Sequence, residues 1–137
     1  MTQIPEGYEP WGGDLAEHYE DLIGPFYVKK CDDGTWKSAF YSEKKHLNGH
    51  GNLHGGLMMS FADTALFAIA REHLGEAAVT VSFNCDFVSA GSANCLIEAS
   101  GEIVKATRSL LFVRGRVYSG DDTLLSFSGI LKKLRRS

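Results

Sequence analysis

The longest apolar segment of the chain predicts a buried helix. Residues 57–74 contain neither proline nor glycine, and their apolar side chains recur at helical spacing until Arg71. A helix that is apolar on nearly every face lies in the interior of a protein rather than on its surface. We therefore expect this helix to form the centre of the fold.

After Gly75 the hydrophobic period changes from that of a helix to that of a strand. From Val79 to Phe87, apolar residues at odd positions alternate with polar residues at even positions, which predicts a strand with one buried face. Three further strand-like runs follow, at residues 95–104, 109–118 and 123–131. The short connectors between them are typical of antiparallel hairpins. A long apolar helix followed by such strands predicts an α+β fold in which the sheet wraps the helix.

The first third of the chain predicts two smaller elements. Residues 14–22 have the pattern of a short amphipathic helix, with Asp14 as its N-cap and an end near Gly24 and Pro25. Residues 35–43 are rich in aromatic side chains and predict a strand.

Length and composition favour one globular domain. The chain has 137 residues, of which 44% are apolar and 23% are charged, and it contains no internal repeat. We therefore expect a single domain over residues 1–137, in which residues 1–34 form a helical N-terminal extension.

Charge and segment patterns argue against two kinds of partner. The 14 Lys and Arg residues against 17 Asp and Glu give a net charge of −3, whereas nucleic-acid-binding domains usually carry a basic surplus. No apolar run approaches the ~20 residues that cross a bilayer, and residues 1–10 lack the pattern of a secretory signal. We expect neither a nucleic-acid nor a membrane partner. The basic segment 132–136 has two open interpretations, a solvated tail or a phosphate contact.

The cysteines and histidines give no clear metal motif. The chain has three cysteines, Cys31, Cys85 and Cys95. Their odd number and the absence of C-x-x-C spacing indicate neither a disulfide framework nor a zinc site, and a reduced cytoplasmic compartment fits them best. His46, His50 and His54 recur every four residues, but the glycines among them disfavour the helix on which they would share a face. We expect no metal and no cofactor.

Asp63 is the residue that a plain structural helix does not explain. It lies two turns into the apolar helix, where an ionised carboxylate is costly unless it is paired. Gly55 and Gly56 precede the same helix, where free backbone N–H groups and the helix dipole favour negative charge. An oxyanion donor and a partly buried carboxylate suit acyl transfer. An aspartate that meets solvent or caps a neighbouring backbone is the alternative, and the spacing leaves both open.

The glycine-rich segment before the helix resembles a family signature. The run Asn48-Gly-His-Gly-Asn-Leu-His54-Gly55-Gly56, with Asp63 nine residues after His54, is similar to the N-x-x-G-x-x-H-G-G…D pattern of hotdog-fold acyl-CoA thioesterases. Within that superfamily it resembles the phenylacetate-type and small mitochondrial acyl-CoA thioesterases. The resemblance implies a hotdog fold, an antiparallel sheet wrapped around a long central helix, and hydrolysis of acyl-CoA to a free acid and CoA.

The resemblance also implies roles for individual residues. Asp63 would be the general base or the nucleophile, and the amide of Gly55 would hold the thioester oxygen. Asn48 would orient the water or the carbonyl from a facing subunit, and His54 would fix the loop or contact the thioester. Thr80, expected on the polar face of its strand, would help to hold the water.

Candidate substrate contacts come from the residues themselves, whereas the expected subunit contact follows from the resemblance. Gly56, Met59 and Phe83 would contact the acyl-CoA substrate, although such apolar positions are more often plain core. The family builds its active site between two subunits, so we expect a homodimer or a dimer of dimers.

Two other functions compete with hydrolysis. A hotdog regulator would bind acyl-CoA without cleaving it and could dispense with Asp63. A hotdog dehydratase would pair a histidine with an acidic residue, and the chain offers His54 and Asp63 for this. The glycine pattern and the presence of Asp63 favour the thioesterase.

Overall fold

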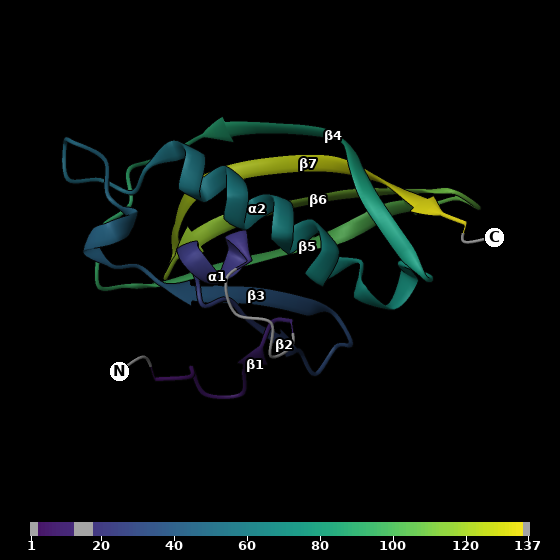
Figure 1. Ribbon diagram of the computed structural model, residues 1–137, viewed down its shortest axis with the longest axis horizontal. Helices are drawn as coiled ribbons and strands as arrows, with labels where there is room; N and C mark the ends of the chain where they lie inside the picture. Colours follow the sequence, from purple (N-terminus) through teal and green to yellow (C-terminus); the bar gives the residue numbers. More distant parts are fainter. Residues whose placement is uncertain (1–2, 13–17, 136–137) are drawn as a thin grey trace.

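The chain forms one antiparallel sheet and one long helix. The computed structural model describes residues 3–12 and 18–135, in the arrangement of Figure 1. The strands are β1 (Glu9–Pro10), β2 (Tyr27–Lys30), β3 (Trp36–Tyr41), β4 (Ala77–Phe87), β5 (Leu96–Ala106), β6 (Leu110–Ser119) and β7 (Asp122–Leu134). The helices are α1 (Tyr19–Ile23) and α2 (Gly55–Ile69), with short 3-10 helices at Lys44–His46 and Arg71–His73. The sheet order is β1-β2-β3-β5-β6-β7-β4, and every neighbouring pair is antiparallel.

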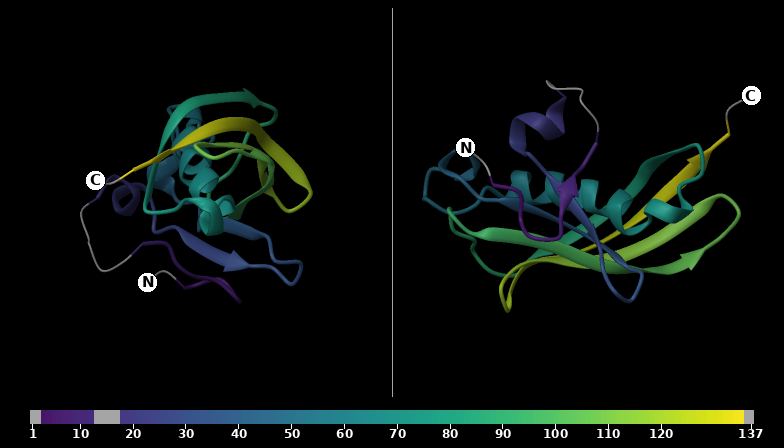
Figure 2. Two further views of the ribbon diagram at one scale, coloured as in Figure 1. Left: turned by 90° about the vertical axis from the view of Figure 1, so that its right-hand side faces the viewer. Right: turned by 90° about the horizontal axis from the view of Figure 1, so that it is seen from below.

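The sheet curves around α2, as the two views in Figure 2 show. The predicted α+β fold and the three strands after β4 are therefore confirmed. Helix α2 begins two residues before the predicted start and ends at Ile69, where a short 3-10 turn continues the chain. The predicted N-cap Asp14 lies outside the described residues, and α1 begins at Tyr19. Strand β2 was not predicted separately, because its four residues carry no long alternation.

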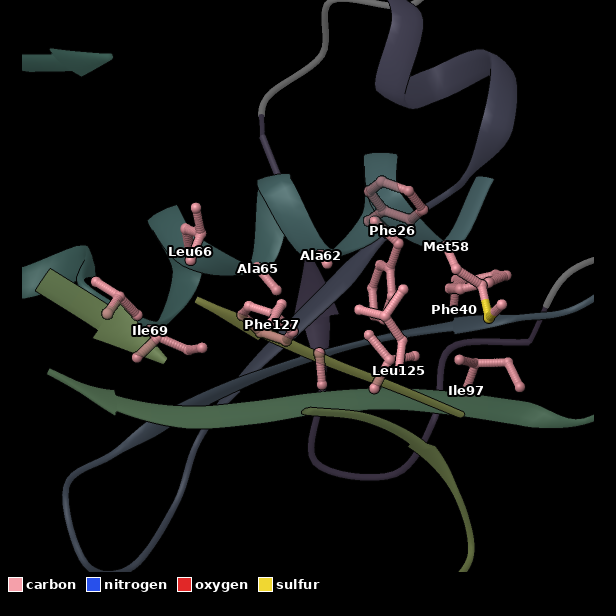
Figure 3. Close-up of a cluster of buried hydrophobic side chains, with 14 of the residues drawn as sticks. Phe26, Phe40, Met58, Ala62, Ala65, Leu66, Ile69, Ile97, Leu125 and Phe127 are labelled. Carbon is pink, nitrogen blue, oxygen red and sulfur yellow. The ribbon is translucent and has the colours of Figure 1, made fainter. Parts of the chain in front are cut away.

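Helix α2 fills the interior of the curved sheet (Figure 3). Phe61 and Leu66 are completely buried, and the ring of Phe61 packs edge-on against Phe40 and Phe26, with centroids 4.7 and 5.1 Å away. Burying each large apolar side chain contributes about 1.5–3 kcal/mol to folding. Gly129 on β7 lets the helix approach the sheet, since a Cβ there would lie 2.4 Å from Leu66 Cδ1. Interior packing thus fixes the position of α2 on the sheet.

Strand β4 lies at the edge of the sheet and departs from its predicted alternation. Val79 and Val81 are 41% and 53% exposed, whereas Thr80 faces α2. The pairing with β7 shifts between Thr80 and Ser82, so one extra residue enters the strand there. Because side chains alternate with a period of two, a one-residue bulge exchanges the faces on its two sides. The prediction of a single buried odd face is wrong before the bulge, and beyond it Phe83 packs against the core as expected.

The segment that follows α2 packs against the side of the sheet opposite β4. The guanidinium of Arg71 stacks between Trp11 and Trp36, with its carbon 5.5 and 4.8 Å from the two ring centroids. Trp36 Nε1 donates a 2.6 Å hydrogen bond to Glu72 Oε2. These contacts attach the N-terminal segment to the core. Among the described residues, no helix is long and apolar enough to span a membrane.

Candidate active site

The loop before α2 is organised by Asn48. Its Oδ1 accepts hydrogen bonds from the backbone N–H groups of His50 (2.9 Å) and Asn52 (3.2 Å). Gly51 completes the turn with a φ of +85°, which glycine adopts without strain. The side-chain oxygen of Asn48 is therefore used within the loop. Its Nδ2 group makes no hydrogen bond to any residue that the structure describes, so it is the atom that could meet a substrate.

His54 caps the N-terminus of α2. Its Nδ1 accepts a 2.9 Å hydrogen bond from the N–H of Gly56, and its own N–H donates to the carbonyl of His46 at 2.9 Å. The neighbouring N–H of Gly55 makes no hydrogen bond within residues 3–12 and 18–135. A free amide at a helix N-terminus is a donor for an oxyanion. The structure places His54 as the cap of α2, and whether it fixes the loop or contacts the thioester stays a prediction.

Phe87 lies directly over Gly55. A Cβ at Gly55 would stand 3.0 Å from Cε1 and 3.2 Å from Cζ of the Phe87 ring. The ring is nevertheless 56% exposed at the end of β4. Sequence reasoning missed this residue because alternation assigned it to the buried face, and no pattern in the sequence marks it as a neighbour of the helix start. We call Gly55, His54 and Phe87 the glycine half-site.

Asp63 is held by a hydroxyl from β4. Thr80 Oγ1 donates a 2.7 Å hydrogen bond to Asp63 Oδ1, and both residues are partly buried. The carboxylate thus binds a side chain from another element, and within residues 3–12 and 18–135 it accepts no hydrogen bond from a neighbouring backbone N–H. Thr80 is not on the polar outer face as predicted, because the bulge turns it toward α2. We call Asp63 and Thr80 the aspartate half-site.

The two half-sites of one chain are too far apart to act on the same bond. Gly55 and Asp63 are eight residues apart on α2, which corresponds to about 12 Å along an α-helix. A carbonyl bound at an oxyanion donor and the water that attacks it must lie about 3 Å apart. One chain therefore holds two separate halves of such a site.

The expected substrate-contact residues occupy different surroundings. Gly56 and Met59 lie on the outward side of α2 with Asp63, and Met59 is 39% exposed. Phe83 instead packs on the core, with its ring stacked 6.3 Å from that of Phe127. No hollow described on a single chain combines these residues with the half-sites. The structure thus places Met59 one turn from Asp63 on α2, Gly56 on the same side two turns away, and Phe83 mainly in the core.

The three regularly spaced histidines do not converge. His46 is buried, where its Nδ1 accepts from the N–H of Glu43 at 2.9 Å and its Nε2 lies 2.6 Å from the carbonyl of Ile23. His50 is exposed in the loop, and His54 caps the helix. In the described part of the chain, no group of three or more His, Cys, Asp or Glu side chains is arranged to hold a metal ion. Separately, burial raises the pKa of the Cys85 thiol, as fits a packing residue.

Comparison with known proteins finds a family profile and two relatives, of which one matches over nearly its full length. The profile of the thioesterase superfamily matches residues 50–126, a range that contains Gly55, Asp63 and Thr80. The protein PA0474 of Pseudomonas aeruginosa, whose name classes it provisionally as an esterase, is 29% identical over 133 residues, 95% of this chain and 97% of that protein. The acyl-coenzyme A thioesterase PaaI of Escherichia coli K12 is 42% identical over 76 residues, 56% of this chain and 54% of that protein.

A solved structure shows the same arrangement of elements. The BH2602 protein of Bacillus halodurans, whose crystal structure was determined with CoA, superimposes with a TM-score of 0.72 and 25% sequence identity. The superposition covers 80% of this chain and 74% of that chain. The sheet and its central helix are therefore shared with a CoA-bound protein.

Proposed function

The chain belongs to the thioesterase superfamily and has its hotdog fold, and from that premise we propose that it hydrolyses acyl-CoA thioesters to free acids and CoA. The observation that carries the proposal is the hydrogen bond between Thr80 and Asp63 on the outward side of α2. This bond holds the Asp63 carboxylate on the outward side of α2. In the homodimer proposed below, that side of α2 lies next to the N-terminus of α2 in the partner subunit. Similarity to the phenylacetate-type branch gives the substrate class as acyl-CoA.

Asp63 acts as general base in the mechanism that we propose. Thr80 occupies Oδ1, which leaves Oδ2 to accept a hydrogen bond from a water molecule. The carboxylate takes a proton from this water as its oxygen bonds to the thioester carbon, and the carbonyl electrons move to the oxygen. The N–H of Gly55 stabilises that oxyanion. Collapse breaks the carbon–sulfur bond, and the CoA thiolate takes the proton from Asp63.

The site requires two subunits because the half-sites of one chain are about 12 Å apart. Along β4, Thr80 lies beside Asp63 of the same chain, and Phe87 lies beside Gly55 of the same chain. If two edge strands β4 pair antiparallel with Thr80 opposite Phe87, each Asp63 meets Gly55 of the partner subunit. The exposed Val81 and the unpaired edge of β4 supply apolar area and free backbone groups for this contact. We therefore propose a homodimer as the smallest active unit.

The remaining residues are proposed to complete the site. Asn48 Nδ2 donates to the carbonyl or the water, and His54 fixes the loop from which Gly55 points. Gly56 and Met59 border the acyl chain on the outward side of α2. Phe83 packs in the core beneath this surface and supports it without contacting the substrate directly.

A thiol-release assay across a panel of acyl-CoA thioesters tests the function. The wild type should release CoA from at least one thioester, and Asp63→Asn should lower kcat by about 10²–10⁴ because the proton acceptor is lost. Circular dichroism and gel filtration of Asp63→Asn serve as the control for fold and assembly. Tight acyl-CoA binding without release by the wild type would instead establish the regulator, and release of water from a hydroxyacyl-CoA would establish the dehydratase.

A single-turnover experiment in ¹⁸O-water separates the two roles of Asp63. A general base places the label in the product acid. A nucleophile displaces the CoA thiolate to form a mixed anhydride, and attack of water at the aspartyl carbonyl of this anhydride then places the label in Asp63 itself. Label in the peptide containing Asp63, detected by mass spectrometry, therefore identifies the nucleophilic route.

A further inference from the structure

Helix α1 lies beside the outward side of α2 that carries Asp63. In Figure 1, α2 runs between β4 above it and α1 below it. Tyr19 Oη and Ser60 Oγ are 2.8 Å apart, so a hydrogen bond joins the two helices. Ser60 gives its own hydroxyl hydrogen to the carbonyl of Gly56 at 3.0 Å, which makes Tyr19 the donor of this bond.

The side chains around Asp63 place α1 and β4 on opposite flanks of it. Successive residues of an α-helix are about 100° apart around its axis, so Met59 lies about 40° to one side of Asp63 and Ser60 about 60° to the other. Gly55 lies beyond Met59 on the first flank, where Phe87 of β4 lies over it. Ser60 lies on the second flank, where α1 meets it. Asp63 thus faces outward between a strand and a second helix.

Helix α1 exposes apolar side chains on this second flank. Tyr19 is 59% exposed and Leu22 is 66% exposed, and their spacing of three residues puts them on the same face of α1. Ile23 packs against the core instead, and its carbonyl lies 2.6 Å from Nε2 of the buried His46. The C-terminal end of α1 is therefore fixed to the core, and its face with Tyr19 and Leu22 stays open.

The acyl chain of the substrate is the occupant that fits this face. In the proposed reaction the thioester carbonyl lies at Asp63 and carries two substituents, the acyl chain and the sulfur of CoA. The partner subunit takes up the β4 flank in the proposed homodimer, so the α1 flank is left for a substituent. An acyl chain gains free energy by leaving water for apolar side chains, whereas the amide groups of the pantetheine arm would lose hydrogen bonds to water there.

We propose that α1 forms the outer wall of the acyl-chain site and that Tyr19 and Leu22 contact the chain, an inference that rests on the proposed thioesterase function. Ser60, to which Tyr19 is bonded, lies about 4.5 Å along α2 from Asp63, the rise of three helical residues. An acetyl group ends one carbon beyond the carbonyl and does not reach this wall, whereas a medium-length or aromatic acyl group does. The wall therefore selects acyl-CoA substrates longer than acetyl-CoA.

Two other roles for this face make different predictions. If α1 only covers the core, removal of its exposed side chains affects all substrates equally. If the face binds a second copy of the chain, the same change alters the oligomeric state. The wall instead predicts a loss that grows with the length of the acyl chain and leaves the assembly unchanged.

The test compares CoA thioesters of increasing length, from acetyl to decanoyl, together with phenylacetyl-CoA. The variant is Tyr19→Ala/Leu22→Ala, and the matched control is Val104→Ala/Leu134→Ala, which also shortens two exposed apolar side chains. We expect the wild type to prefer an ester longer than acetyl-CoA. For that ester the variant should lower kcat/KM by about tenfold or more through KM, with kcat unchanged, because each buried CH₂ group raises affinity about fourfold. The shortest ester that is cleaved should show little change, and the control variant none.

The inference fails if the wild type prefers acetyl-CoA, if the variant loses activity on all esters equally or on none, or if gel filtration shows that the variant assembles differently. If the wild type cleaves no ester, the proposed function fails instead, and calorimetry with the uncleavable thioethers S-octyl-CoA and S-methyl-CoA still decides the role of α1. Weaker binding of S-octyl-CoA alone by the variant supports the wall. Equal binding of S-octyl-CoA by variant and control, or weaker binding of both thioethers, rejects it.

Discussion

The two half-sites are built in opposite ways. The glycine half-site presents a backbone N–H, and most of its contacts join residues close in sequence, such as His54 with Gly56. The aspartate half-site presents side chains, and the hydrogen bond that holds it joins residues 17 positions apart on different elements. The first therefore depends on local turn geometry, and the second depends on the packing of β4 against α2. This difference decides how each half-site responds to substitution.

A side chain at Gly55 should cause a large loss of activity. Gly55→Val would push against Phe87 and cover the free N–H, whereas no substitution can remove the N–H itself. We expect kcat to fall by about 10²–10³, the cost of losing one oxyanion donor. Steady-state kinetics on the acyl-CoA found in the panel measures this effect.

The smaller variant Gly55→Ala tests the role of Phe87 in that loss. Its methyl group meets the edge of the Phe87 ring, so Phe87→Ala should restore part of the activity in the double variant. A double-mutant cycle with strictly additive losses would show that the ring does not limit access to the amide.

Mixed dimers should recover activity that neither parent has. Asp63→Asn and Gly55→Val are each inactive alone, but a dimer containing one of each keeps one intact pair of half-sites. With random pairing, half of the dimers are mixed and each has one working site of two, so we expect about a quarter of wild-type activity. Co-expression with two affinity tags isolates the mixed dimer, which should then have about half of wild-type activity.

The absence of any recovery would contradict a site shared between subunits. The control is a mixed dimer of one wild-type and one Asp63→Asn subunit, isolated with the same two tags. It gives the activity of a dimer that has one working site.

Removal of the Thr80 hydroxyl should have a smaller effect than loss of the carboxylate. Thr80→Val keeps the shape of the side chain but leaves Asp63 Oδ1 without its donor. We expect kcat to fall roughly tenfold, as for a hydrogen bond to a charged group, and Thr80→Ser to retain most of the activity. An unchanged kcat in Thr80→Val would show that the hydroxyl does not orient the carboxylate.

The same difference explains which features the sequence could predict. The cap by His54 and the free N–H at Gly55 follow from residues that are neighbours in the chain, so a short motif reveals them. The long helix was predictable because its apolar positions follow one period. Its N-terminus was misplaced by two residues, because helix propensity disfavours glycine and the cap decides the start.

The contacts of β4 could not be predicted in the same way. A bulge at Val81 depends on the pairing of β4 with β7, and alternation alone cannot show where an extra residue enters. The sequence therefore placed Thr80 on the wrong face, although its hydroxyl was named as a candidate. Phe87 was missed for the same reason, since its position over Gly55 depends on where the strand crosses the helix start.

The smallest effect concerns the support of the glycine half-site by His46. A backbone N–H can only donate, so the bond from Glu43 requires an unprotonated Nδ1 and places the proton on Nε2, toward the carbonyl of Ile23. Burial lowers the pKa of the His46 imidazole below its usual value. The folded state therefore binds this proton more weakly than the unfolded state, whose histidine titrates near 6.5.

Stability should consequently fall as the pH drops from about 6.5 toward the lowered pKa of the folded state, by at most about 1.4 kcal/mol per pH unit for this one group. Above 6.5 both states carry a neutral imidazole, and the dependence vanishes. His46→Asn keeps an acceptor near the N–H of Glu43 but does not titrate, so urea unfolding between pH 5 and 7.5 should show a shallower pH dependence than in the wild type. Because the carbonyl of His46 accepts from the N–H of His54, the glycine half-site should lose order first at low pH. Equal slopes for the two proteins would show that His46 does not couple this half-site to pH.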